Sequence, residues 1–171
     1  IEFINTKKEI YTEINSPLNI AISNAEHILG RIPIIYSSND LLDIVNLRWR
    51  GQFSENAKSL AFGNYFPEMN HNEIVGWQEN SEILRNFAVL FLRDRDDNPR
   101  ILKRLKVTKE ILEPYRGIDI EIESEGNSRL ERIFDLVYLG DWISFYLAIM
   151  YKTDPSPIEK INILKNKLME T

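Results

Sequence analysis

The chain has 171 residues, of which 43% are hydrophobic and 27% charged, a composition typical of one folded domain rather than of a disordered or fibrous protein. Its 26 acidic residues outnumber the 21 basic ones and give a formal net charge of −5, which argues against a nucleic-acid partner. The absence of cysteine excludes disulfide scaffolds, cysteine-ligated zinc and thiol catalysis, and two histidines are too few for a histidine-rich metal site.

The elements follow in chain order from hydrophobic spacing and from the residues that break it. The patterns predict helices over residues 7–14 and 20–29, a strand over 32–36, a helix over 41–62, an irregular segment over 63–80, a strand over 87–92, a helix over 98–112, a strand over 117–122, and helices over 128–151 and 158–168. Gly30 is expected to end the second helix, and Gly51 to interrupt the third. The turn from Ser37 to Asp40 is expected to cap that third helix.

Strands that alternate with long helices favour an α/β fold. We expect a three-layer sandwich around a central, mainly parallel sheet, with extra helices at the C-terminal end and functional loops at the carboxyl ends of the strands. No repeat or linker divides the chain, so residues 1–171 are expected to form a single domain. No segment approaches the ~20 apolar residues that cross a bilayer, and no signal-peptide pattern is present, so we expect no membrane partner and a cytoplasmic location.

Polar and aromatic residues are interleaved between positions 47 and 78, whereas an ordinary surface helix separates its apolar and charged faces. The spacing of Arg48, Gln52 and Glu55 can place all three on one helical face. Asn70 and His71 fall on a predicted loop, where polar side chains serve either turns or sites. A solvated Arg48–Glu55 ion pair and plain turn chemistry explain the same spacing, so the pattern alone leaves both interpretations open.

Two long motifs carry a family resemblance. Residues 48–62, RWRGQFSENAKSLAF, and residues 66–77, FPEMNHNEIVGW, resemble the signature of the bifunctional phosphoglucose/phosphomannose isomerases. The segments 30–38 and 138–168 match the same family in order and spacing. The resemblance covers nearly the whole chain but only the C-terminal half of that family, which is built from two sugar-isomerase (SIS) domains. It implies a flavodoxin-like SIS fold for residues 1–171.

The resemblance implies an isomerase that converts glucose 6-phosphate and mannose 6-phosphate to fructose 6-phosphate through an enediol, without a cofactor or metal. Glu55 of the S-E-N-A-K motif would move the proton between C1 and C2, because a carboxylate can return the proton that it removes. His71 of the N-H-N-E motif would open the sugar ring, and would do so in the neighbouring subunit of a homodimer. Lys165 in the final helix would assist ring opening or bind a sugar oxygen, with Lys160 as the less expected substitute.

Four further residues of these motifs are expected to bind substrate: Arg48, Gln52, Asn56 and Asn70. Alternatives stay open for several positions. Arg48 can orient the helix that carries Glu55, Glu55 can be a surface acid paired with Lys58, and Lys165 can be an ordinary exposed lysine. The proton-transfer role requires Glu55 to lie in a cleft poor in water, near a His71 imidazole of its own or of a second chain.

The phosphate-binding loop of the family is missing from this sequence. In the family a Ser/Thr/Gly-rich loop of the N-terminal SIS domain holds the sugar phosphate at a helix N-terminus. Here Ser37 and Ser38 form the only strand-to-helix serine pair. We therefore expect a C-terminal half that needs an N-terminal SIS domain as a partner. The alternative is a non-catalytic sugar-phosphate-binding or dimerisation SIS domain, which the missing loop favours and the retained motifs oppose.

Overall fold

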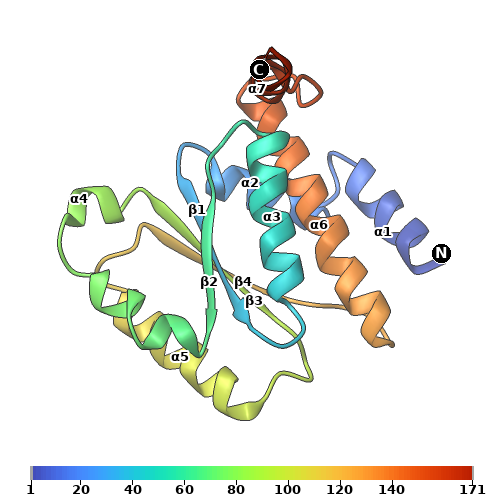
Figure 1. Cartoon of the computed structure of the whole chain (residues 1–171). Coiled ribbons are helices and arrows are strands. Elements are labelled where there is room, and N and C mark those ends of the chain that lie inside the picture. Colours follow the sequence, from blue (N-terminus) through green and yellow to red (C-terminus); the bar gives the residue numbers. More distant parts are fainter. Residues whose placement is uncertain (1, 171) are drawn as a thin grey trace.

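The computed structural model describes residues 2–170, in which a parallel sheet lies between two layers of helices (Figure 1). The strands are β1 (Ile32–Ser38), β2 (Phe62–Phe66), β3 (Phe87–Arg93) and β4 (Ile118–Glu123). Their order in the sheet is β2-β1-β3-β4, and every neighbouring pair is parallel. The α/β sandwich predicted from the sequence is therefore confirmed.

The helices divide between the two faces of the sheet. They are α1 (Glu2–Thr12), α2 (Ile20–Ile28), α3 (Asp43–Glu55), α4 (Ser81–Leu84), α5 (Pro99–Leu112), α6 (Arg129–Met150) and α7 (Glu159–Met169), with two 3-10 helices, η1 (Glu68–Asn70) and η2 (Glu73–Gly76). The first three helices and α6 contribute to the core on one face, whereas α5 and the segment around η1 pack on the other. Helix α7 stands apart from both layers at the C-terminal end (Figure 1).

Strand β3 shows why the sheet is covered on both sides. Ala88, Leu90 and Leu92 face the core that α3 and α6 share, whereas Val89 and Phe91 face the core beneath α5. Successive side chains of a strand point to opposite faces, so an unbroken apolar run needs two hydrophobic layers. The interpretation of residues 87–92 as a doubly covered strand is confirmed.

Helix α6 qualifies the expectation that no apolar segment approaches the length of a membrane span. Its 22 residues are long and apolar enough to cross a bilayer by length and composition. Leu136, Leu139, Ile143 and Leu147 are nevertheless buried in the core that α6 forms with α2 and α3. Helix α6 is therefore the central helix of one layer.

Strand β2 runs from the last residue of the predicted third helix into the segment predicted to be irregular, so the predictions were wrong over residues 62–66. The strand was not predicted because it contains Gly63 and Asn64, and glycine and asparagine are typical of turns. A Cβ on Gly63 would come within 2.5 Å of the Ile35 carbonyl oxygen and 2.7 Å of Asn46 Oδ1. The glycine therefore permits the close approach of β2 to β1 and α3, and it marks a strand rather than a turn.

Two predictions about α3 were also wrong. The helix runs through Gly51 without interruption and ends at Glu55, well before residue 62, and Lys58 then takes a left-handed φ of 56°. Ser37 and Ser38 belong to β1 instead of capping α3, whose N-cap residue Leu42 makes no side-chain capping bond. Hydrophobic residues of the 56–62 segment extended the helical pattern past the true helix end.

Two other helix boundaries were predicted correctly. Gly30 follows α2 with a φ of +76°, a conformation that favours glycine at the end of a helix. The side chain of Asn98 accepts a hydrogen bond from the Arg100 amide at 2.9 Å, and Pro99 occupies the first turn of α5.

Candidate functional site

The end of α3 and the start of α7 border a groove of about 690 Å³. Glu55, the last residue of α3, lines this groove together with Lys160 from the first turn of α7. A carboxylate and an ammonium group therefore share one cavity. The side chain of Glu55 is exposed, so the cleft poor in water that its predicted role requires is not closed by the described residues alone.

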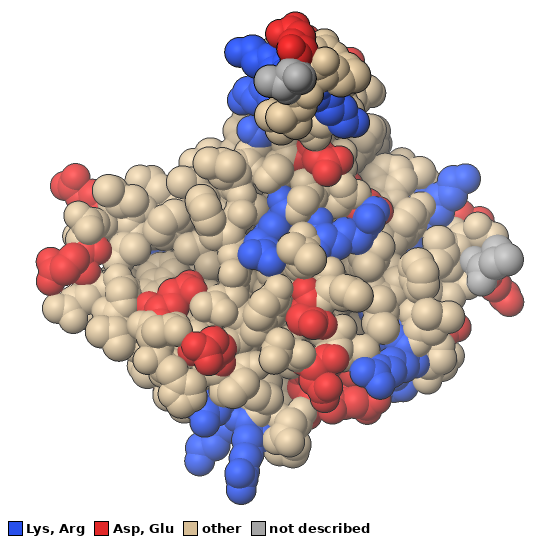
Figure 2. Space-filling view, viewed as in Figure 1, with Lys and Arg blue, Asp and Glu red and all other residues tan. Residues whose placement is uncertain are grey.

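Lys165 lies farther along α7 and does not line this groove. Helix α7 has no buried residue, and Ile163, Leu164 and Leu168 on it are more than half exposed. Figure 2 shows the C-terminal helix projecting from the body, with basic and acidic side chains around it. Of the two lysines predicted to act at the site, the structure places Lys160 beside Glu55 and leaves Lys165 on an exposed helix.

Lys58 joins the end of α3 to the segment that leads into α7. Its Nζ donates hydrogen bonds to the main-chain carbonyls of Glu55 at 2.5 Å, Pro155 at 3.1 Å and Pro157 at 2.7 Å. No ion pair between the Lys58 ammonium and the Glu55 carboxylate is found among the described residues, so that alternative prediction was wrong. Among residues 2–170 the Glu55 carboxylate has no hydrogen-bond or ion-pair partner, and Glu55 lines the groove.

Three of the residues predicted to bind substrate instead bond to α6. Arg48 Nη2 donates to Asp141 Oδ2 at 2.8 Å, and Gln52 Nε2 donates to Asp141 Oδ1 at 2.7 Å. Asn56 Nδ2 donates to Ser144 Oγ at 2.9 Å. Arg48 pairs with Asp141 rather than with Glu55, which fits the alternative that it orients α3. In this chain the polar side chains of Arg48, Gln52 and Asn56 therefore form a polar contact between α3 and α6.

A buried contact beside these polar bonds fixes the position of α3 along α6. Trp49 is fully buried, and its Nε1 donates to the Leu136 carbonyl at 2.8 Å. A Cβ on Gly140 would come within 2.3 Å of Trp49 Nε1, so only glycine allows the indole to lie against the α6 backbone. This contact sets where α3 ends and hence where Glu55 lies.

His71 follows η1 on a segment that is tied to the sheet through Glu73. The hydroxyl of Tyr36 donates to Glu73 Oε1 at 2.5 Å, and Asn64 Nδ2 donates to Glu73 Oε2 at 2.7 Å. Trp77 Nε1 in turn donates to the Tyr36 hydroxyl at 2.9 Å. Burial first, and the negative charge of Glu73 second, raise the pKa of Tyr36 above its ordinary value, so the phenol remains a donor at neutral pH. His71 itself is exposed.

A single chain does not bring Glu55 and His71 together. Glu55 precedes β2, and His71 follows it at the opposite end of the strand (Figure 1). The first and last of the five β2 residues are about 13 Å apart at the usual rise per residue. The side chains therefore belong to two different regions of the surface, which we call the Glu55 groove and the His71 loop (residues 67–77).

Asn70, the fourth residue predicted to bind substrate, lies on the His71 loop and faces α5. Its Nδ2 donates to Thr108 Oγ1 at 2.9 Å, whereas its Oδ1 is buried without a hydrogen-bond partner. It lines a groove of about 410 Å³ with Arg100 and Arg104 of α5. Asn70 is therefore placed apart from Arg48, Gln52 and Asn56.

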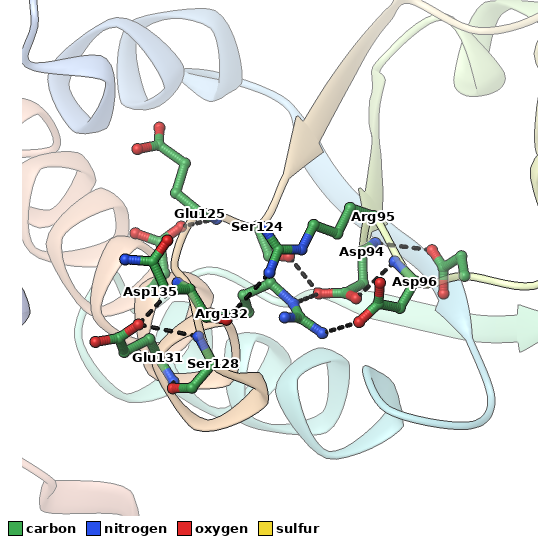
Figure 3. A network of polar contacts seen from close by, with 11 residues as sticks. Asp94, Arg95, Asp96, Ser124, Glu125, Ser128, Glu131, Arg132 and Asp135 are labelled. Atoms are coloured by element: carbon green, nitrogen blue, oxygen red, sulfur yellow. Dashed lines mark hydrogen bonds and ion pairs between the residues drawn. The ribbon is translucent and has the colours of Figure 1, made fainter.

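The carboxyl ends of the strands, expected to carry functional loops, hold an ion-pair network (Figure 3). Arg132 Nε donates to Asp94 Oδ2 at 2.7 Å, and Ser124 Oγ donates to the same oxygen at 2.5 Å. Arg132 also pairs with Asp96. Burial alone would raise the pKa of Asp94, but the hydrogen bonds from Arg132 and Ser124 hold it below its ordinary value. The network joins the loops after β3 and β4 to α6.

A crevice of about 470 Å³ opens beside this network, lined by Ser38, Asp40 and Asp97 among others. It lies where the strand order reverses between β1 and β3, the position at which open α/β sheets commonly bind ligands. Its lining holds four Asp and two Arg residues and no Ser/Thr/Gly-rich loop, which is unlike the phosphate loop of the family. Among residues 2–170 no group of three or more His, Asp or Glu side chains is placed to hold a metal ion.

Comparison with known proteins adds the following findings. The model of the bacterial phospho-glucose isomerase C-terminal SIS domain matches residues 18–168. The chain is 40% identical over 99% of its length to a bifunctional phosphoglucose/phosphomannose isomerase of Caldicellulosiruptor bescii, of which it covers 50%. A relative of the same name from Aquifex aeolicus is 42% identical over 84% of the chain, which covers 44% of that relative.

A solved structure from Thermus thermophilus, described as a glucose-6-phosphate isomerase like protein, is also similar. Its TM-score is 0.67 at 28% identity, over 80% of this chain and 45% of that one. The chain thus spans about half the length of the curated relatives that it matches. The matched segment includes the Glu55 groove, the His71 loop and nearly all of α7, and on this basis the chain belongs to the family of bacterial phosphoglucose isomerase C-terminal SIS domains.

Proposed function

We propose that this chain is the C-terminal half of a sugar-phosphate isomerase that interconverts glucose 6-phosphate or mannose 6-phosphate with fructose 6-phosphate. The observation that carries the proposal is the Glu55 groove, where a free carboxylate and the Lys160 ammonium border one cavity in a chain whose relatives bear that enzyme's name. The name of a relative is a property of that relative, so the activity of this chain requires the test below.

In the proposed reaction the ring opens first, with a proton delivered to the ring oxygen and one removed from the C1 hydroxyl. Glu55 then takes the proton from C2 of the open-chain aldehyde while the C1 carbonyl oxygen gains a proton, and an enediol forms. The same carboxyl returns its proton to C1 while the C2 hydroxyl loses its proton, which yields the ketose without net gain or loss of atoms. Glucose and mannose 6-phosphates differ in configuration at C2, so one base serves both if the substrate rotates about C2–C3.

Ring opening is assigned to His71 of a second chain. The two ends of β2 keep Glu55 and His71 of one chain apart, and the exposed side chain of His71 is accessible to a second chain. A homodimer in which each His71 enters the partner's groove would complete the site. Lys160, which lines the groove, and Lys165, on the exposed part of α7, are the proposed helpers that bind a sugar oxygen.

Phosphate binding is assigned to the N-terminal SIS domain that the relatives' additional length accommodates. In the crevice at the strand ends of this chain four Asp residues outnumber two Arg residues, and Arg132 is already paired with Asp94 and Asp96, so the crevice is a poor replacement for a phosphate loop. The N-terminal domain would also cover Glu55 and exclude water from the groove. Exclusion of water strengthens electrostatic interactions at the reacting carbons.

The test is a coupled assay of both sugar phosphates, with this chain fused to its preceding half and with this chain alone. We expect turnover from the fused protein and little or none from the 171 residues by themselves. Glu55→Gln in the fused protein should lower kcat about 10³-fold on both sugars while substrate still binds, because a general base contributes roughly 10²- to 10⁴-fold. Glu26→Gln, an exposed α2 variant, is the matched control.

Near-normal turnover by Glu55→Gln would remove Glu55 as the base. A fused protein that binds sugar phosphate but does not turn it over would instead favour the alternative of a non-catalytic binding or dimerisation domain. Robust activity of the isolated chain would show that the phosphate site is not where we place it.

A further inference from the structure

Lys58 occupies an unusual position for an exposed lysine. Its backbone has a left-handed φ of 56°. Its ammonium group donates three hydrogen bonds, and all three acceptors are main-chain carbonyls. An ammonium group has three N–H donors and no acceptor. The carbonyls of Glu55, Pro155 and Pro157 therefore use its full donor capacity, which leaves none for a substrate.

The acceptors lie on the two segments that border the Glu55 groove. One belongs to the last residue of α3, and the other two belong to the linker between α6 and α7. Ile158, which follows directly, is the N-cap residue of α7 and makes no side-chain capping bond. Lys58 is thus bonded to the chain on both sides of the cavity in which Glu55 and Lys160 lie.

The linker makes other contacts, which stabilise its own conformation but do not join it to α3. The Asp154 carboxylate accepts a hydrogen bond from the Ser156 amide at 2.8 Å, which forms a local turn. Bonds to Ser156 hold the pKa of Asp154 below its ordinary value, and the positive charge of Lys58 contributes to the same shift. Because α7 has no buried residue, hydrophobic packing within this chain contributes little to its placement.

We infer that Lys58 is a positioning residue of the proposed isomerase site: it holds the linker against the end of α3 and so sets where the lysines of α7 lie relative to Glu55. The inference rests on the proposed function. Lys58 would act through Glu55 and α7, without touching the sugar. Misplacement of a reacting group by about 1 Å can cost on the order of 10²-fold in rate, so a lost tie of this kind is measurable.

The experiment uses the fused two-domain protein and the variant Lys58→Met, which keeps an unbranched side chain one heavy atom shorter and removes its donors. We expect kcat to fall about 10- to 100-fold, with a smaller change in KM. Lys58→Arg, which retains charge and donors, should recover part of the loss. Lys152→Met is the matched control, because Lys152 is an exposed lysine with the same φ of 56° in the turn after α6.

Two double-mutant cycles, Lys58→Met with Lys160→Met and Lys58→Met with Lys165→Met, distinguish the placement of α7 by Lys58 from a purely structural role. If Lys58 acts by placing α7, its removal should cost much less once the α7 lysine that matters is gone. Hydrogen exchange over residues 153–158 should also rise in Lys58→Met. Lys58→Gly guards against misfolding, because glycine favours the left-handed turn while lacking the ammonium.

The inference would be overturned if the kcat losses of the single variants multiply independently in both double-mutant cycles. It would also be overturned if Lys58→Met and Lys152→Met had the same kcat. Glu55→Gln measured beside them keeps the two ideas apart. An active Glu55→Gln protein contradicts the proposed function, whereas an inactive Glu55→Gln protein with an unimpaired Lys58→Met protein contradicts only the role of Lys58.

Discussion

The Glu55 groove and the His71 loop lie at opposite ends of β2 and are held in place in different ways. Contacts with the sheet and the core hold the His71 loop in place. Glu73 accepts two side-chain hydrogen bonds from the sheet, and Met69 and Trp77 are buried. The Glu55 groove is bordered on one side by α3, which is fixed by Trp49, and on the other by α7, which has no buried residue.

The difference indicates which part of the site a lone chain organises. The hydrogen bonds from Tyr36 and Asn64 of the sheet to Glu73, together with the buried Met69 and Trp77, hold the His71 loop without help from another chain. The Glu55 groove has one rigid wall and one wall held mainly through the linker that Lys58 bonds. We therefore expect the His71 loop to be preorganised, and the Glu55 groove to be completed by the N-terminal half and by a second chain.

The largest effect that tests this comparison is expected from His71→Ala in the fused protein. Activity on ring-closed glucose 6-phosphate should fall about 10²- to 10⁴-fold, because an acid-base group is lost. Activity on an open-chain substrate analogue should fall far less, since no ring has to open. The ratio of the two kcat/KM values in the coupled assay is the measurement, and equal losses would contradict the ring-opening role.

Complementation tests whether His71 crosses to a second chain. Glu55→Gln and His71→Ala proteins, each inactive, are mixed, dissociated and reassociated. If every site takes Glu55 from one chain and His71 from the other, half the dimers are mixed and each has one intact site, so about a quarter of wild-type activity returns. No recovery despite exchange of subunits would place both residues in one chain's site.

A smaller effect is expected from Glu73→Gln, which tests how the His71 loop is fastened. The amide nitrogen would replace one of the two oxygens that accept from Tyr36 and Asn64, so one buried donor would lose its acceptor. We expect a loss of about 1–3 kcal/mol in the free energy of unfolding. Ring opening should slow only a few-fold, because His71 itself is retained. Urea unfolding and the coupled assay are the measurements.

Glu68→Gln is the matched control for this variant. Glu68 lies on the same loop, and its carboxylate accepts only an exposed bond from Asn72. Its replacement should change the free energy of unfolding by less than about 0.5 kcal/mol, as is usual for surface substitutions. Equal destabilisation by both variants would show that the loop is not held through Glu73.

Much of the fold could be predicted from the sequence because local rules coincide with the tertiary structure. The run at residues 87–92 is apolar at every position, and Asn98-Pro99 and Gly30 mark helix ends by their own backbone chemistry. Strand β2 escaped prediction because its glycine is required by the neighbouring Ile35 carbonyl and Asn46 side chain, neither of which is adjacent in sequence. Local spacing contains no information about such a close approach.

The candidate site residues remain predictions, and their partners within the chain could not be read from the sequence. Arg48, Gln52 and Asn56 bond to Asp141 and Ser144, which lie about 90 positions later. Helical spacing shows which residues share a face and does not show what covers that face. The bonds from Lys58 to Pro155 and Pro157 had no local signal for the same reason.

A further prediction concerns Asp94, in the ion-pair network at the carboxyl ends of the strands. Bonds from Arg132 and Ser124 outweigh burial and lower the pKa of Asp94 in the folded protein. A carboxyl whose folded pKa lies below its unfolded pKa stabilises the fold at pH values above the unfolded pKa, and this contribution disappears as pH falls through the folded pKa. Asp94→Asn should therefore lower Tm at pH 7.

The gap in Tm between wild type and Asp94→Asn should then begin to narrow as the pH falls below about 4, the ordinary pKa of the carboxyl in the unfolded chain, and it should keep narrowing until the pH passes the lower pKa of Asp94 in the folded protein. The difference between the two proteins is informative because all other titrating groups are common to both. Asp40→Asn, at the rim of the same crevice, controls for the change in net charge. A Tm gap that stays constant from pH 7 to pH 3 would mean that Asp94 acts through packing rather than through its charge, and the strand ends would then need another explanation for their order.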